Sequence, residues 1–499
     1  MFEKVLVANR SEIAIRVLTA CQEMGIKTVA VYSDVDANSP HVRFADEAYC
    51  LGDPAPTESY LNIEKIIAAA KETGVEAIHP GYGFLAENPL FSMRCEKEEI
   101  VFIGPRSRVI RLMGDKVRAK RTVEKAGVPV IPGYHGTDTS TETLIEEGRK
   151  LGFPLFIKAV LGGGGKGMRI VRREDELESS IESCKREALS AFGDSSLFLE
   201  KYLARPRHIE FQILGDRHKK VIHLFERECS IQRRHQKIIE ETPSCALTSY
   251  LREKMGEAAL RVAEAVGYTN AGTVEFMMDE NKNFYFLEMN TRLQVEHPIT
   301  EAVTGVDLVK WQFRLASGEH LTLRQDNLHQ IGHAIECRIY AEDPTREFLP
   351  STGRLHEVEL PRGINVRHDS GIETGLEVTR HYDPLLSKLT VHAENRRESI
   401  EKMIWALSKY VILGVVTNVG FLKHILSNES FKSGEITTHF IEEHSKELFP
   451  KPKIPDEALI AAVLAETIDE PQAQVLKVSA ENDPYSPWKT AGNWRNIPR

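Results

Sequence analysis

The first 33 residues alternate between short apolar runs and an amphipathic segment, and this alternation restricts the fold more than any other feature of the chain. Residues 4–10 (KVLVANR) and 27–33 (KTVAVYS) are typical of buried strands, and residues 12–25 (EIAIRVLTACQEMG) predict an amphipathic helix closed by Gly25. Two strands joined by a helix lie parallel in one sheet, because a parallel pair needs a long crossover connection. Residues 1–115 are therefore predicted to form a parallel α/β domain.

The first turn of this domain lacks the glycines of a dinucleotide-binding site. It reads Ala-Asn-Arg-Ser-Glu at residues 8–12, whereas dinucleotide-binding domains carry Gly-x-Gly-x-x-Gly at the same place. We therefore predict the parallel fold without the dinucleotide.

Three further parts follow along the chain. Residues 116–330 open with a helical pattern and contain two predicted hairpins, and residues 331–446 begin with the strand pattern HAIECRIYAE. The tail, residues 447–499, is rich in proline, lysine and alanine and has one helical pattern at residues 456–466. We expect it to be an appendage with little core.

The composition excludes several functional classes. A net charge of −9 gives the chain no overall attraction to nucleic-acid phosphates or to an anionic membrane. No run of about 18 apolar residues occurs, and Glu3 and Arg10 interrupt the region where a signal peptide needs an apolar core. The seven cysteines form no Cys-x-x-Cys pair, and their odd number suits reduced thiols. We expect a cytoplasmic protein without a disulfide framework.

Residues 284–298 (FYFLEMNTRLQVEHP) contain a polar side chain at every second position. In an extended chain a period of two sends these side chains to one face. The members of this polar row are Glu288, Asn290, Arg292, Gln294 and Glu296.

The hairpin that leads into the polar row predicts a metal site. If residues 280–283 form its loop, the register that follows places Glu275 opposite Glu288. Two carboxylates with Cβ atoms about 5 Å apart repel each other. Together with Asn290 they offer oxygen ligands that suit magnesium. The alternative is a solvated strand face whose carboxylates are held apart by an offset register.

The glycine-rich segment at residues 162–167 (GGGGKG) indicates a loop that can cover a polyphosphate. Glycines leave backbone N–H groups unobstructed, and Lys158 at the end of the preceding strand adds a cation. The loop lies between two strands and lacks Gly-x-x-x-x-Gly-Lys-Ser/Thr, which excludes the P-loop class. A flexible turn without a ligand is the alternative.

Residues 226–243 (ERECSIQRRHQKIIEETP) are denser in polar and cationic groups than a core strand. Gln232, Arg234, His235 and Lys237 lie within six positions. Cations beside a metal-carboxylate site are what a transferring phosphoryl group or a small anion requires. A solvated basic strand is the alternative.

Five motifs together carry a resemblance to a known family. In chain order they are GGGGKGM (162–168), EKYL (200–203), QRRHQK (232–237), EMNTRLQVEHP (288–298) and ECRIYAEDP (336–344). The chain from residue 1 to about 446 resembles the biotin carboxylases of the ATP-grasp superfamily. This resemblance implies a parallel α/β amino-terminal domain, an ATP-grasp domain with a mobile lid at about 132–203, and an α+β carboxy-terminal domain.

The resemblance also implies roles for individual residues. Those expected to bind ATP are Lys116, Lys158, Gly163, Gly164, Gly165, Met168, Glu200, Lys201, Leu203, His208, Gln232, His235, Glu275 and Glu288. The magnesium ligands would be Glu275, Glu288 and Asn290. Bicarbonate would be held by Lys237, Arg292, Gln294 and the Val295 backbone, and Glu296 would remove its proton. Arg338, with Tyr82 nearby, would face biotin.

The implied reaction is the ATP-dependent carboxylation of biotin by bicarbonate through carboxyphosphate, with magnesium or manganese as cofactor. The residues expected to act in catalysis are Lys237, Arg292, Glu296 and Arg338. The chain has no Met-Lys-Met biotinylation site and no carboxyltransferase domain, so biotin is expected on a separate carrier protein, next to a carboxyltransferase subunit. The resemblance also implies a homodimer.

The carboxyl acceptor stays open at this point. The tail after residue 447 is similar to that of the biotin carboxylase subunit of two-subunit pyruvate carboxylases, which favours pyruvate. The alternatives are the corresponding subunit of an acetyl-CoA or other acyl-CoA carboxylase, or of a 2-oxoglutarate carboxylase.

Two other classes of protein share part of this pattern. Another ATP-grasp ligase would keep the lid and the metal carboxylates, but would not be expected to carry Arg292, Glu296 and Arg338 in these contexts. A regulatory nucleotide-binding module would be free to lose Glu296. Neither class is expected to hydrolyse ATP in response to bicarbonate and biotin.

Overall fold

The computed structural model describes residues 1–160, 168–449 and 456–467. The chain divides into two compact units, Met1–Phe449 and Pro450–Arg499. In the second unit the described part is one helix, α17 (Asp456–Thr467), as the sequence pattern predicted. None of the helices in the described part of the chain has the length and apolar content that a membrane crossing requires.

The amino-terminal part is built around a five-stranded parallel sheet, as predicted, with the strand order β3-β2-β1-β4-β5. Its strands are β1 (Lys4–Val7), β2 (Lys27–Ser33), β3 (Glu47–Gly52), β4 (Ala77–His79) and β5 (Val101–Phe102). The accompanying helices are α1 (Ser11–Glu23), α2 (Pro40–Phe44), α3 (Ile63–Thr73), α4 (Pro89–Lys97) and α5 (Ser107–Gly114). The loop from β4 to α4 carries Tyr82 and Glu87.

An eight-stranded sheet forms the centre of the first unit. Its order is β14-β13-β10-β11-β12-β15-β22-β20. The strands are β10 (Arg207–Gly215), β11 (Val221–Arg233), β12 (Gln236–Thr242), β13 (Asn270–Met278), β14 (Phe284–Asn290), β15 (His333–Tyr340), β20 (Val366–Ser370) and β22 (Leu385–Ala393). Strand β12 pairs with β15, so the sheet continues across residue 330 without interruption.

Helices pack on this sheet, because their apolar side chains are buried when they contact its apolar face. Helix α9 (Ser249–Val266) begins where the Thr248 side chain accepts from the Leu251 N–H and ends before Gly267, whose φ is 62°. It buries Met255 and Val262 against Phe276. Burying one such side chain stabilises the fold by roughly 1.5–3 kcal/mol. Helices α10 (His297–Thr304) and α11 (Leu308–Ala316) come after β14 along the chain.

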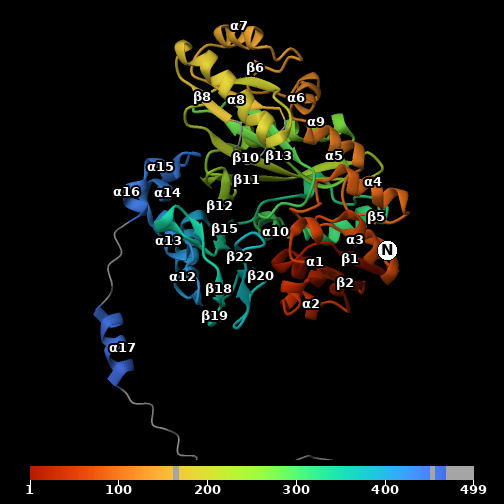
Figure 1. The fold of residues 1–499 in the computed structure, drawn as a ribbon, viewed down its shortest axis with the longest axis vertical. Helices are drawn as coiled ribbons and strands as arrows, with labels where there is room; N and C mark the ends of the chain where they lie inside the picture. The colour runs from red at the N-terminus through yellow and green to blue at the C-terminus, as the bar shows by residue number, and fades with distance from the viewer. Residues whose placement is uncertain (161–167, 450–455, 468–499) are drawn as a thin grey trace, which may run out of the picture. The chain divides into compact units, whose positions relative to one another are not determined.

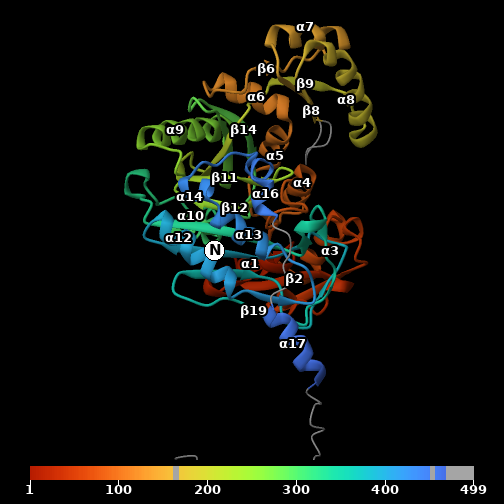
Figure 2. The same cartoon turned by 90° about the vertical axis from the view of Figure 1, so that its left-hand side faces the viewer.

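A small α/β part lies at one end of the first unit (Figures 1 and 2). It has a four-stranded sheet of order β6-β9-β7-β8 and its own core. Its elements are β6 (Gly133–Tyr134), α7 (Thr141–Leu151), β7 (Leu155–Ala159), β8 (Met168–Val171), α8 (Leu177–Phe192) and β9 (Leu197–Lys201). Strands β7 and β8 pair antiparallel, which confirms the predicted hairpin. The glycines of its tip lie outside the described residues.

The carboxy-terminal part packs helices on the end of the central sheet that carries β15 and β22 (Figure 1). These helices are α12 (Arg396–Ser408), α13 (Val419–Ser427), α14 (Glu429–Ser433), α15 (Phe440–Glu443) and α16 (Ser445–Leu448). Three short strand pairs complete it: β16 (Glu342–Asp343) with β17 (Leu349–Pro350), β18 (Gly353–Arg354) with β21 (Glu377–Val378), and β19 (Glu357–Glu359) with β23 (Val411–Leu413).

Candidate active site

Most candidate residues of the sequence lie in four places of the first unit. The small α/β part carries Lys158 on β7, Met168 on β8, and Glu200 and Lys201 on β9, with Leu203 just after it. The central sheet carries His208, Gln232, Lys237, Glu275, Glu288, Asn290 and Arg338. Lys116 is the first residue of α6 (Lys116–Lys125), and His235 lies in the exposed turn between β11 and β12. Gly163, Gly164 and Gly165 lie outside the described residues.

Glu275 and Glu288 face each other across β13 and β14, which confirms the predicted pairing. The register at the tip of this hairpin differs from the expected one. Met278 and not Asp279 pairs with Phe284, so the register is shifted by one residue from the predicted one, and a β-bulge at Leu287 restores the alignment of the two glutamates. The pairing of the carboxylates was right, although the loop from which it was derived was wrong by one residue.

The two facing carboxylates differ in their electrostatic surroundings. Burial raises the pKa of Glu288, and the negative charge of Glu275 raises it further. Burial alone would also raise the pKa of Glu275, but Lys237 and His208 outweigh it and hold that pKa well below its usual range. The described side chains around Glu288 therefore do not fully neutralise the negative charge of the two carboxylates.

Asn290 lies beside these carboxylates. Its amide Nδ2 is 2.7 Å from Glu275 Oε1, and its Oδ1 accepts from Arg292. A half-turn of the amide would aim its oxygen at the carboxylates. Two carboxylates and one amide oxygen are hard ligands, and this donor set fits a magnesium ion.

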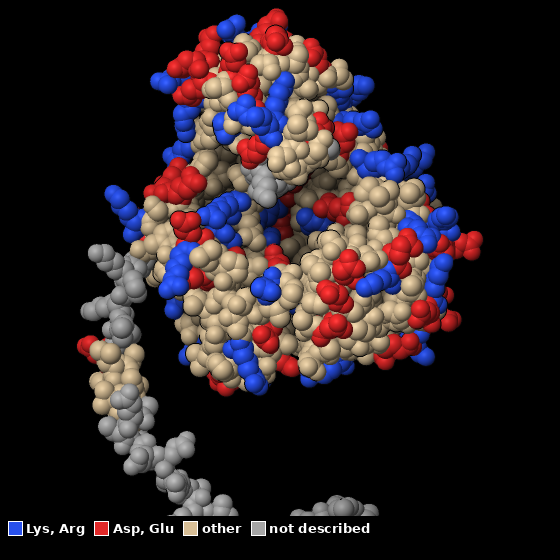
Figure 3. All heavy atoms as spheres, viewed as in Figure 1, with Lys and Arg blue, Asp and Glu red and all other residues tan. Residues whose placement is uncertain are grey.

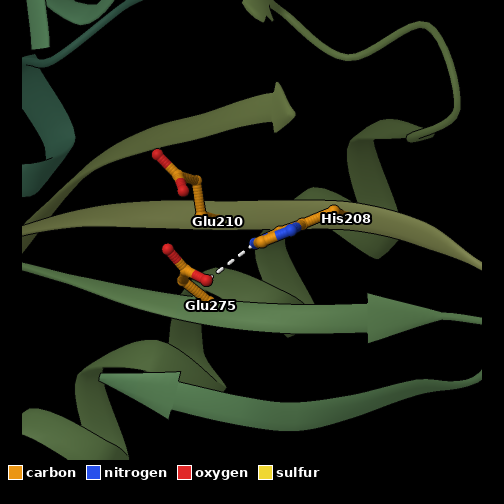
Figure 4. Close-up of side chains that lie close together, drawn as sticks. All are labelled: His208, Glu210 and Glu275. Atoms are coloured by element: carbon orange, nitrogen blue, oxygen red, sulfur yellow. Dashed lines mark ion pairs between the residues drawn. The ribbon is translucent and has the colours of Figure 1, made fainter. Parts of the chain in front are cut away.

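Sequence reasoning missed a third carboxylate, Glu210. It lies opposite Glu275 on the neighbouring strand β10, and together with His208 the two glutamates form a cluster that could hold a cation (Figure 4). His208 Nε2 is 2.8 Å from Glu275 Oε2. Arg227 Nε donates to Glu210 over 2.5 Å. The alternation His-Ile-Glu on β10 was the only sequence signal for Glu210.

Lys237 joins the carboxylates into one network. Its Nζ donates to Glu275 over 2.7 Å, to Glu296 over 2.8 Å and also to Glu210. Burial would lower the pKa of Lys237, but these three carboxylates hold it well above its ordinary value. Gln232 lies opposite Lys237 in the register of β11 and β12, and its Nε2 is 2.7 Å from His208 Nδ1. Residues 226–243, for which a solvated basic strand was the alternative, thus form a hairpin.

Glu296 lies at the start of α10, fully buried between Lys237 and Arg338. Arg338 Nη2 donates to Glu296 Oε2 over 2.9 Å, and Arg338 Nε donates to Glu240 over 2.6 Å. Burial alone would raise the pKa of Glu296, but the two cations hold it well below its usual range. Burial raises the pKa of Glu240 to about 7.

The second half of the polar row is not a strand. Strand β14 ends at Asn290, and residues 291–296 form a loop into α10, so the extended chain predicted through residue 298 was wrong. The side chains nevertheless stay together, because Arg292 Nη1 donates to Gln294 over 2.7 Å and Gln294 Nε2 donates to Glu275 over 3.0 Å.

The amino-terminal part reaches this loop through one more residue that the sequence did not reveal. Glu87 accepts from Arg292 Nε over 2.8 Å and from the Thr291 N–H over 2.9 Å. The two contacts fix the side chain of Arg292 beside Asn290. Nothing in local sequence spacing links residues that lie 205 positions apart.

Tyr82 and the Val295 backbone meet at a buried lysine. Lys388 Nζ donates to Val295 O over 2.8 Å and lies 5.6 Å from the centre of the Tyr82 ring. The same Nζ is 3.5 Å from Glu12 and from Asp369. Residues from the amino-terminal, central and carboxy-terminal parts of the first unit therefore converge here.

The surface of the first unit is hollowed on one face. Figure 3 shows a cleft below the small α/β part, with both acidic and basic side chains at its floor. On the side of that part, Lys158 Nζ donates to Glu200 Oε2 over 2.6 Å, and Lys158 pairs with Met168 across β7 and β8.

Family models match nearly the whole first unit. The biotin carboxylase N-terminal domain matches residues 1–110, the ATP-binding domain of the carbamoyl-phosphate synthase L chain matches residues 115–324, and the biotin carboxylase C-terminal domain matches residues 336–443.

Known proteins resemble the chain over most of its length. A pyruvate carboxylase subunit of Methanothermobacter thermautotrophicus is 56% identical over 446 residues, which are 89% of this chain and 91% of that protein. The alpha subunit of the mitochondrial methylcrotonoyl-CoA carboxylase of Dictyostelium discoideum is 50% identical over 494 residues, which are 99% of this chain and 70% of that protein.

A solved structure has the same fold. The biotin carboxylase domain dimer of the Hydrogenobacter thermophilus 2-oxoglutarate carboxylase, in complex with MgADP, ADP and bicarbonate, superposes with a TM-score of 0.87. It is 48% identical in sequence, and the match covers 91% of this chain and all of that one.

Proposed function

The chain belongs to the biotin carboxylase family, and from this premise we propose that its buried network carries out the ATP-dependent carboxylation of biotin by bicarbonate. The observation that carries the proposal is the position of Glu296, a buried carboxylate held in its anionic form by Lys237 and Arg338. A fixed carboxylate beside two shared cations is suited to take a proton from a small bound anion.

Magnesium would be held by Glu275, Glu288 and Asn290. The raised pKa of Glu288, caused by burial and by the charge of Glu275, supports a cation between the two carboxylates. When bound, the ion would supply charge neutralisation for the phosphate oxygens of ATP.

ATP would lie in the cleft below the small α/β part. We propose that Lys116 and Lys158 hold its phosphates, with Gly163, Gly164 and Gly165 at the loop between β7 and β8. The adenine would contact Met168 and the segment Glu200–Leu203. Since the Glu200 side chain is bound by lysines, its segment would meet the adenine through its backbone. His208, Gln232 and His235 would line the rest of the nucleotide.

Bicarbonate would bind to Lys237, Arg292, Gln294 and the Val295 N–H. In the structure Lys237 is shared by three carboxylates. An anion that accepts from Lys237 weakens its hold on Glu296, so the basicity of Glu296 rises when bicarbonate arrives. Glu296 then takes the bicarbonate proton while a bicarbonate oxygen attacks the γ-phosphorus and the bond to ADP breaks.

The resulting carboxyphosphate breaks down to CO2 and phosphate. Phosphate takes the ureido proton of biotin, whose nitrogen then attacks CO2. Arg338 lies on β15, at the carboxy-terminal part, and donates to Glu296. It would stabilise the negative charge that develops on the ureido oxygen. Tyr82 would line the same side.

The division of the chain at residues 115, 330 and 446 is part of the proposal. It is supported by the family-model matches, which break at residues 110–115 and 324–336. We propose a homodimer that works with a separate biotin carrier protein and a carboxyltransferase subunit. The identity to a pyruvate carboxylase subunit favours pyruvate as the acceptor. The match to a methylcrotonoyl-CoA carboxylase subunit supports an acyl-CoA as the acceptor. The match to a 2-oxoglutarate carboxylase domain supports 2-oxoglutarate.

The test is ATP hydrolysis measured with and without bicarbonate and free biotin. The wild-type chain is expected to release phosphate only with bicarbonate, and faster with biotin. Arg338→Ala is expected to keep ATP binding and to lose the biotin-dependent rate by about 10²- to 10³-fold. The matched control is Arg397→Ala on α12, an exposed arginine, which should leave the rate unchanged. Full turnover in Arg338→Ala would remove the role given to Arg338, and hydrolysis that ignores bicarbonate would contradict the function itself.

A further inference from the structure

Glu200 is a fully buried carboxylate that binds two lysines from different parts of the fold. Lys158 Nζ on β7 donates to its Oε2 over 2.6 Å, and Lys120 Nζ on α6 donates to its Oε1. Lys158 is the lysine that the proposed function assigns to the ATP phosphates. Lys120 has no assigned role.

The two lysine side chains differ in their exposure to solvent. The side chain of Lys158 is 16% exposed, whereas that of Lys120 is 4% exposed and packs 4.8 Å from the centre of the Phe198 ring. Lys158 can therefore turn toward a ligand, while Lys120 is confined beside Glu200.

Two lysine side chains contact the Glu200 carboxylate, and burial, followed by the charges of Lys158 and Lys116, lowers the pKa of Lys120, so the charge of Lys120 depends on its contact with Glu200. His135 Nε2 is 4.0 Å from Glu200 Oε1, but burial, and after it Lys120, lower the pKa of His135 to about 4, so this ring adds no charge near neutral pH. Two lysines face one carboxylate. One lysine can leave without stranding the buried charge of Glu200.

We propose that Lys120 is a positioning residue that keeps Glu200 neutralised when Lys158 turns from Glu200 to a phosphate of ATP. The proposal rests on the proposed function, which gives Lys158 its phosphate. Without Lys120, Glu200 would retain Lys158 as the one charged lysine that contacts it among the described residues, because breaking a buried ion pair leaves a costly unpaired charge. ATP would then compete with Glu200 for Lys158.

A double-mutant cycle tests this role. Lys120→Met removes the ammonium and keeps most of the side-chain volume, Glu200→Gln removes the charge that would retain Lys158, and the third variant combines both. The steady-state rate of bicarbonate-dependent ATP hydrolysis is measured against ATP concentration at saturating magnesium. Thermal unfolding is recorded for each variant. The matched control is Lys125→Met, an exposed lysine on the same helix.

Lys120→Met is expected to raise the KM for ATP by about 10-fold or more, the loss that a charge-assisted contact carries, with a smaller change in kcat. The double variant is expected to have a KM within about 3-fold of that of Glu200→Gln alone, since the loss of Lys120 has no effect on Lys158 once residue 200 carries no charge. Lys125→Met should match the wild type.

Three results would overturn the proposal. If Lys120→Met raises KM as much in the Glu200→Gln background as in the wild type, Lys120 binds ATP itself. A fall in thermal stability with no recovery of KM in the double variant would mean that Lys120 only holds the fold together. An unchanged KM in Lys120→Met would leave it without a role in ATP binding. Failure of the proposed function is distinguishable, since the wild-type chain would then show no bicarbonate-dependent hydrolysis.

Discussion

His79 lies at the carboxyl end of β4, fully buried, two residues before the glycine that precedes Tyr82. The Gly81 N–H donates to its Nδ1 over 3.0 Å, so the proton is on Nε2, which is 3.1 Å from Gln312 Oε1. Both ring nitrogens are therefore engaged in the neutral form. Protonation of Nδ1 would break the contact that shapes the turn to Tyr82.

Burial lowers the pKa of His79 from 6.5 to about 4, and this shift predicts a pH dependence of stability. Below pH 6.5 the unfolded chain binds a proton that the folded chain excludes, so stability is complete above pH 6.5 and is lost as the pH falls toward 4. The contribution of this histidine is about 3 kcal/mol. Urea unfolding at several pH values measures it.

The matched variant is His79→Gln, which keeps a polar side chain that does not titrate. Its free energy of unfolding is expected to fall less steeply between pH 6.5 and pH 4 than that of the wild type. The difference in slope should correspond to the uptake of up to about one proton on unfolding. Equal slopes in the two proteins would show that His79 is not held neutral by the fold.

The residues that local sequence revealed are those in one hairpin or one motif. Glu275 and Glu288 were found because period-two spacing and a short loop fix which side chains face each other. Glu87 and Lys120 escaped, because each acts through a partner that lies 80 or more positions away. Their contacts follow from tertiary packing, which no local pattern contains.

At the scale of elements, the β13–β14 hairpin decides the geometry of the metal-binding candidates. Its loop turns at Lys282, whose N–H donates to Asp279 O over 3.0 Å and whose φ is 65°. A residue other than glycine in this left-handed conformation is strained by roughly 1–2 kcal/mol. Glycine is the residue that hairpins of this kind favour.

Lys282→Gly is therefore expected to raise the free energy of unfolding by up to about 1 kcal/mol, because relief of the strain exceeds the extra flexibility of the unfolded chain. Thermal unfolding measures the change. The matched control is Glu253→Gly on α9, where helical backbone makes glycine unfavourable by about 1 kcal/mol. A loss of stability in Lys282→Gly similar to that of the control would show that the loop does not need a left-handed residue.

Most elements could be predicted from the sequence, and the exceptions have a physical reason. Strand β2 and the β7–β8 hairpin match the apolar pattern. The end of β14 at Asn290 and the bulge at Leu287 do not, because the strand edge pairs with Val130 and the chain must turn into α10. Strand endings depend on what lies next to the strand as well as on its own residues.

At the scale of the whole molecule, the candidate site lies where three parts of the first unit meet. Arg16 of α1 pairs with Glu301 over 3.0 Å and with Asp307 over 2.7 Å. The Tyr382 hydroxyl donates to Pro54 O over 2.7 Å. These contacts tie the amino-terminal sheet to α10 and to the carboxy-terminal part, so that Glu87 binds Arg292, and Tyr82 lies beside Lys388, which binds the Val295 carbonyl next to Glu296.

The sequence predicted three domains and a tail, and it did not predict that one sheet would join the second and the third. Because β12 pairs with β15, Lys237 and Arg338 lie on neighbouring strands of one continuous sheet. Antiparallel partners separated by some 90 residues leave no local signal. The closeness of Arg338 to Glu296 follows from that pairing.

The central claim is that Glu296 activates bicarbonate for transfer to biotin, and transfer of label from radioactive bicarbonate to free biotin tests it most directly. The wild-type chain is expected to form labelled carboxybiotin only with ATP and magnesium. Glu296→Gln is expected to bind ATP normally and to lower the rate of labelling by about 10²- to 10⁴-fold. Labelling at the wild-type rate in Glu296→Gln, or none in the wild-type chain with every substrate present, would contradict this role of Glu296.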